Sequence, residues 1–128
     1  MFMIYQRPIS AAQVDAVNRN PESSLSKAYR RLLFPSPDNA QERVTAALNL
    51  GLYQKTMLIG ATDGGSVTLE QVFDAGNGHP SEGVNVVSMG GHPSMSVGDI
   101  AVSLLDDDAY LCMPHGWHVL DLTLDLVY

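Results

Sequence analysis

The last ten residues alternate between apolar and polar side chains along most of their length. Leucine stands at every second position from 120 to 126, with Asp121, Thr123 and Asp125 between. Successive side chains of a β-strand point to opposite faces, so this spacing predicts a strand over residues 119–128 with one buried face. A half-buried strand requires a sheet, because isolated pairs of strands are at best marginally stable in water.

The first half of the chain shows helical spacing instead. Ser10 and Gln13 match a capping box at the start of a first helix. Apolar residues three and four positions apart predict a second helix over about residues 25–32 and a third over about 38–52. We therefore predict a single α+β domain spanning residues 1–128. Its helices would lie mainly in the N-terminal half, and a small, bent antiparallel sheet would form the C-terminal half.

Shorter segments of β-forming residues stand between turn signals elsewhere in the chain. Thr68 and Gln71 indicate the start of a short helix within residues 67–75. Glycine and proline make residues 76–94 a long loop that contains one short strand, and three consecutive aspartates form an acidic turn. Strands are expected over residues 2–6, 53–62, 84–89, 97–105 and 109–113.

Charge divides the chain into two parts. Residues 1–55 hold all seven Lys and Arg and four acids, a net +3, whereas residues 56–128 hold ten acids and neither Lys nor Arg. The overall charge of −7 argues against direct binding of nucleic acid, whose phosphates require clustered Lys and Arg. Carboxylates suit a partner protein with a basic surface. The residues expected to form this contact are Asp99, Asp106, Asp107 and Asp108, with Tyr110 and Trp117 as anchors.

The compartment follows from the cysteine count and from the absence of targeting signals. Cys112 is the sole cysteine, which excludes an internal disulfide and fits a reducing compartment. We therefore expect a cytoplasmic protein without a signal peptide or a membrane span. No cofactor is expected, because the glycine-rich segments lack the Gly-Lys-Ser/Thr element of a phosphate loop. The strand ending at Tyr128 would provide a sheet edge for self-association.

A second hypothesis concerns metal binding. Cys112, His115 and His118 form a Cys-x2-His-x2-His run, and zinc prefers thiolate and imidazole ligands. Against it, a lone cysteine in an apolar strand behaves as a small hydrophobe, and no Lys or Arg lies nearby to lower the pKa of its thiol. The alternative function is a metal- or ligand-binding enzyme built around the glycine-rich loop and His79, His92, His115 and His118.

A block in the second half has a distinctive order of motifs. A Leu-Glu-x-x-Phe helix at Leu69–Phe73 and Asn77 precede a Ser-x-Ser-Val-Gly-Asp turn at Ser94–Asp99. An apolar strand, an aromatic strand and the pair Gly116–Trp117 follow. This order resembles small phage- and plasmid-borne proteins of unknown function, including the YodL-like group, over about residues 69–118. Here the intervening loop is richer in glycine, and tryptophan replaces phenylalanine in the last pair. The resemblance implies an accessory protein of a mobile element.

Overall fold

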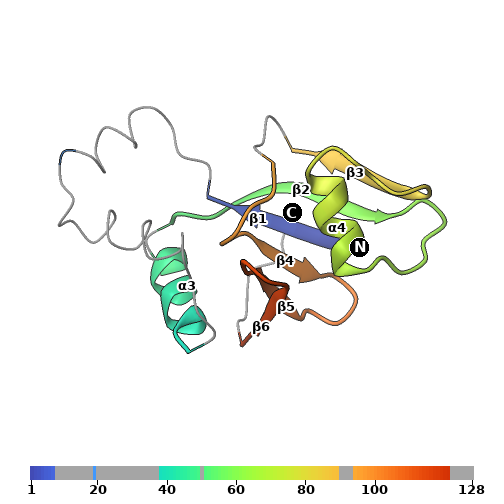
Figure 1. The fold of residues 1–128 in the computed structure, drawn as a ribbon. Helices are drawn as coiled ribbons and strands as arrows, with labels where there is room; N and C mark the ends of the chain where they lie inside the picture. The colour runs from blue at the N-terminus through green and yellow to red at the C-terminus, as the bar shows by residue number, and fades with distance from the viewer. Residues whose placement is uncertain (8–18, 20–37, 50, 90–93, 122–128) are drawn as a thin grey trace.

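The structure is a computed structural model that describes residues 1–7, 19, 38–49, 51–89 and 94–121. Within them, six strands form one sheet of order β3-β2-β1-β4-β5-β6, and every neighbouring pair is antiparallel (Figure 1). Two short helices pack against this sheet. In chain order the elements are β1 (Phe2–Gln6), α3 (Ala40–Asn49), β2 (Gln54–Ala61), α4 (Leu69–Gly76), β3 (Val84–Ser88), β4 (Ile100–Ser103), β5 (Ala109–Cys112) and β6 (Trp117–Leu120).

The first strand, β1, lies inside the sheet and is buried at all five positions. Met3 and Tyr5 join the hydrophobic core that contains α3, whereas Phe2 and Ile4 join the core that contains α4. A strand covered on both faces is apolar along its length instead of alternating. We call the two sides of the sheet the α3 face and the α4 face.

Each helix covers only part of its face. The α3 core is built with residues of β1, β4, β5 and β6, whereas α4 contacts β2 and β3. Figure 1 correspondingly shows α4 over the β2–β3 side of the sheet and α3 near β6. Among the described helices, α3 does not extend over β3 on the α3 face. Likewise, α4 does not extend over β6 on the α4 face.

The prediction of helices mainly in the N-terminal half is wrong for the part of the chain that the structure describes. The sheet dominates, and it takes β1 and β2 from the first half, while the second half contributes α4. The physical reason is that β1 pairs with β2 and β4, which are distant in sequence, and local spacing carries no signal of such pairing. The helices expected near Ser10 and over residues 25–32, and most of the strand expected over residues 119–128, lie outside the described residues.

Local predictions are confirmed at both helices. Val44 and Ala47 of α3 are buried, and Gly51 after the helix has a φ of 70°, in the left-handed region that favours glycine. At α4, the Gln71 amide donates to the Thr68 hydroxyl, and the Thr68 amide donates to the Gln71 side chain at 2.8 Å. This capping box satisfies two amides that lack partners within the helix. Neither helix is long and apolar enough to cross a membrane.

We expect Gly76→Ala to lower the free energy of unfolding by about 1 to 3 kcal/mol, measured by urea denaturation. Gly76 ends α4, and a Cβ atom there would collide with the side chain of Met95. Met95 is 3% exposed, so it has little room to move away.

The double variant Gly76→Ala with Met95→Ala is the control for this collision. Removing the Met95 side chain opens the space that the new methyl group needs. The double variant should therefore be no less stable than Met95→Ala alone. A loss from Gly76→Ala that is the same with and without Met95 would show that the collision is not the cause.

Candidate functional site

A row of five residues crosses the α4 face of the sheet. Four of them lie in β1, β2, β5 and β6, and the fifth directly precedes β4. The strand register pairs Gln6 with Gln54 and Cys112 with Trp117. Asp99, immediately before β4, lies between these pairs. Its carbonyl accepts from the Cys112 amide at 2.8 Å, and its Oδ2 accepts from Gln6 Nε2 at 3.0 Å. The row therefore brings together residues of β1, β2, β5 and β6 around one carboxylate.

Side chains from the first half of the chain hold the loop at residues 94–98 beside this row. Arg7 Nη2 donates to the carbonyl of Val97 at 3.0 Å, and the Tyr53 hydroxyl donates to the carbonyl of Gly98 at 2.6 Å. Gly98 has a φ of 95°, which confirms the prediction that this glycine takes a left-handed turn conformation. The loop is thus fixed by side-chain contacts that the sequence did not reveal.

The carboxylate of Asp99 is buried, with only 3% of the residue exposed. Besides Gln6, the backbone amide of Ser96 donates to it at 2.9 Å, as predicted for an aspartate in a turn. Burial raises the pKa of Asp99, and the hydrogen bonds from Gln6 and Ser96 and the charge of Arg7 oppose that rise. Its burial means that Asp99, expected on the acidic docking surface, does not lie on a surface.

The Tyr53 hydroxyl, which donates the hydrogen bond to Gly98, is also buried away from water. Burial raises the pKa of its hydroxyl, Arg7 lowers it and Asp99 raises it, so the hydroxyl keeps its proton for the bond to Gly98. Sequence reasoning missed Gln6, Arg7 and Tyr53. The one available signal was Gln6, a polar residue that follows four apolar residues of β1 and is itself buried.

Cys112 lacks the properties of a nucleophile. Burial, with the charge of Asp99 as a second cause, raises the pKa of its thiol to about 11. The reactive form of cysteine is the thiolate, which is scarce at neutral pH when the pKa is this high. Cys112 therefore behaves as a buried packing residue within the row.

The register also separates Cys112 from the histidine proposed to share a metal with it. Cys112 lies opposite Trp117, whereas His118 lies opposite Leu111, a residue of the α3 core. Adjacent residues of a strand point to opposite faces, so the Cys112 and His118 side chains leave the sheet on different sides. Among the residues described, no group of three or more His, Cys, Asp and Glu side chains is placed to hold a metal ion.

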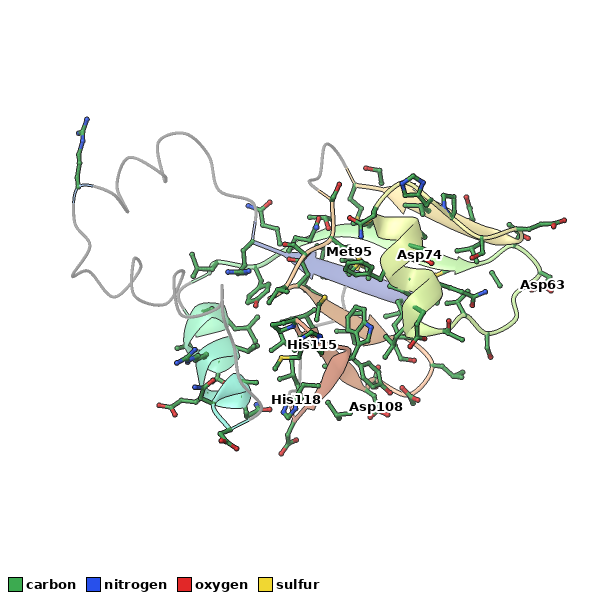
Figure 2. The ribbon with its side chains drawn as sticks, viewed as in Figure 1. Asp63, Asp74, Met95, Asp108, His115 and His118 are labelled. Carbon is green, nitrogen blue, oxygen red and sulfur yellow. The ribbon has the colours of Figure 1, made fainter. Side chains whose placement is uncertain are left out.

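The other histidines come from separate segments. His79 is exposed just after α4, and His115 is exposed in the turn between β5 and β6. Figure 2 shows His115 and His118 at β5 and β6, away from Asp63 and its neighbours. His92 lies outside the described residues. Of these histidines, the structure therefore describes three, and His79 lies on a different segment from His115 and His118.

An apolar patch with two aromatic rings lies on the α4 face over β5 and β6. Tyr110 is directly opposite Val119, which is 64% exposed, and Trp117 lies two residues before Val119. The Tyr110 ring packs edge-on against Phe2, with ring centres 6.4 Å apart. We call Tyr110, Trp117 and Val119 the aromatic patch.

The acidic turn predicted at Asp106, Asp107 and Asp108 is confirmed between β4 and β5, and all three residues are exposed. Asp106 Oδ1 accepts from the Asp108 amide at 3.1 Å, and Asp107 has a φ of 64°, which aspartate tolerates. Burial and then the charges of Asp108 and Asp106 raise the pKa of Tyr110, so the turn borders the aromatic patch. Figure 2 shows Asp63 and Asp74 on other parts of the molecule.

We expect the stability of the wild type, relative to Asp99→Asn, to fall as the pH rises above 3.8, the ordinary pKa of aspartate. The folded protein has the raised pKa, so it holds the proton where the unfolded chain has lost it. The stabilisation is complete below 3.8 and is lost as the pH rises through the folded-state pKa. Urea denaturation over a pH series measures this difference. The exposed variant Asp108→Asn controls for net charge, and a difference that rises with pH would contradict the assignment.

We also expect Cys112 to react slowly with iodoacetamide in the native protein at pH 8. With a pKa of about 11, only about one thiol in a thousand is ionised at that pH, and burial restricts access further. Mass spectrometry would follow the labelling, and denaturant should accelerate it strongly. Native labelling as fast as labelling in denaturant would show a reactive, accessible thiol.

Comparison of the chain with known proteins identified no relative. No protein-family model, curated protein or solved structure matches the chain. The resemblance of residues 69–118 to the YodL-like group therefore stays a prediction from the sequence.

Proposed function

We propose that this protein is a non-catalytic interaction module that binds a basic surface of a partner protein through the acidic turn and the aromatic patch. The observation that carries the proposal is their adjacency: Asp108 stands two residues before Tyr110 at the start of β5, on the face that also holds Trp117.

The acidic turn and the aromatic patch each offer groups that attract Lys and Arg side chains. A guanidinium or ammonium group is attracted to the face of an aromatic ring, and nearby carboxylates add a direct ionic contact. Tryptophan and tyrosine provide much of the binding energy in protein interfaces, whereas exposed charges mainly steer the encounter. The chain carries no Lys or Arg after Lys55, so no such side chain of that half competes for the carboxylates.

We place this module in the cytoplasm, as an accessory protein of a mobile element. The resemblance of residues 69–118 to phage- and plasmid-borne proteins supports the setting, and the lone buried Cys112 supports the compartment. A host or element-encoded protein with a basic surface, including one that otherwise binds nucleic acid, is the partner class that these charges fit.

Two matched triple variants test the proposal in a pull-down from nuclease-treated bacterial lysate. One variant carries Asp106→Asn, Asp107→Asn and Asp108→Asn, and asparagine preserves the turn geometry. The control carries Asp63→Asn, Glu70→Gln and Asp74→Asn, which change the net charge equally elsewhere. We expect the wild type and the control to retain a basic protein that the turn variant loses.

Salt provides the second readout of the same experiment. Raising the salt from about 0.1 M to about 1 M shortens the screening length from about 10 Å to about 3 Å, so the retained protein should be released. Equal retention by both triple variants would contradict the proposal, and so would retention that resists salt. Retention of no protein by the wild type would also contradict it.

A further inference from the structure

The helix α4 is followed by an asparagine and then a glycine, a pair in which the asparagine side chain can react with the next backbone amide. Of the six asparagines in the chain, Asn77 is the one that precedes a glycine. Gly78 has no side chain, so nothing on that residue shields its amide nitrogen from the Asn77 carboxamide. We propose that Asn77 is a site of spontaneous deamidation and that the folded end of α4 controls its rate.

The reaction requires only base and water. After base removes its proton, the Gly78 nitrogen attacks Cγ of Asn77. A bond forms between these two atoms, the bond from Cγ to Nδ2 breaks, and the released nitrogen takes up a proton and leaves as ammonia. Water then opens the resulting succinimide ring. Cleavage of its Cγ–N bond gives aspartate, and cleavage of its backbone C–N bond gives isoaspartate, whose main chain runs through Cβ. In both products water has replaced ammonia.

The folded end of α4 holds both reacting groups away from this geometry. The Gly78 amide donates to the carbonyl of Ala75 at 3.1 Å, and Asn77 Nδ2 donates to the carbonyl of Phe73 at 2.9 Å. The ψ of Asn77 is 13°, so the Gly78 nitrogen is nearly eclipsed with the amide nitrogen of Asn77. Closure of the ring requires the Gly78 nitrogen to lie in line with Cβ instead. The ring can therefore form only after Asn77 rotates and the bond to Ala75 breaks.

These protecting hydrogen bonds belong to one short helix. The His79 amide also donates to the carbonyl of Asp74 at 2.9 Å, and the capping box of Thr68 and Gln71 closes the other end. A helix of eight residues is too short to be stable in parts, so we expect it to open as a unit. The deamidation rate is then the rate in the open state multiplied by the fraction of molecules in which α4 is open.

Deamidation weakens the helix end that controls it. An aspartate in place of Asn77 loses the donor to the Phe73 carbonyl, and its charge stands near Asp74, where the carbonyls that end the helix are already partly negative. The last turn of α4 holds no basic residue to offset this charge. Isoaspartate adds a main-chain atom and displaces Gly78 from its partner. Opening of α4 therefore leads to a covalent change that favours the open state.

Incubation of the wild type, Thr68→Ala and Ser66→Ala in mildly alkaline buffer, with and without urea, tests the proposal. Thr68→Ala removes the N-cap of α4, and Ser66→Ala is the control at an exposed residue outside the capping box. Peptide mass spectrometry measures the conversion of Asn77, and circular dichroism checks that each variant is folded. We expect conversion of the wild type to be about tenfold slower in buffer than in urea. In buffer, Thr68→Ala should convert about fivefold faster than the wild type and the control.

In urea the three proteins should convert at one rate, because no helix remains to protect Asn77. A wild type that converts as fast in buffer as in urea would overturn the proposal, and this comparison does not depend on the folding of a variant. Absence of conversion in urea would show that Asn77 is not a deamidation site. A folded Thr68→Ala variant that converts no faster than Ser66→Ala would show that opening of α4 does not control the reaction.

Discussion

Burial of β1 on both faces is the constraint on which the rest of the structure depends. Five consecutive buried residues of one strand require a neighbour on each edge and a layer on each side. The neighbours are β2 and β4, and the layers are the cores that contain α3 and α4. A polar substitution at Met3 or Ile4 would therefore disturb the ladder and one core together.

The end of β1 is also where the strand ceases to be apolar. Gln6 is buried, so its side chain needs polar partners, and it finds them in Asp99 and the carbonyl of Ser94. The carboxylate of Asp99 in turn accepts the Ser96 amide, which shapes the turn that leads into β4. A polar residue at the end of the central strand thus fixes the position of a loop that is distant in sequence.

How much the sequence revealed depends on how local each feature is. The capping box of Thr68 and Gln71, the left-handed Gly51 and the turn of Asp106–Asp108 depend on neighbouring residues, and all were predictable. The central place of β1 depends on pairing with remote strands. The burial of Asp99 likewise depends on Gln6, ninety-three positions away, so its charge suggested a surface role that its environment excludes.

The placement of the two described helices explains why the two ends of the sheet differ in the side chains that they expose. Because α3 packs near β6 and α4 packs over β2 and β3, each helix leaves the far end of its own face open. At the β6 end the open surface holds aromatic rings beside carboxylates, which favours contact with a basic protein. At the β3 end it holds the exposed aliphatic side chains of Val87 and Met89, so the chemistry that suits a basic partner lies at the β6 end.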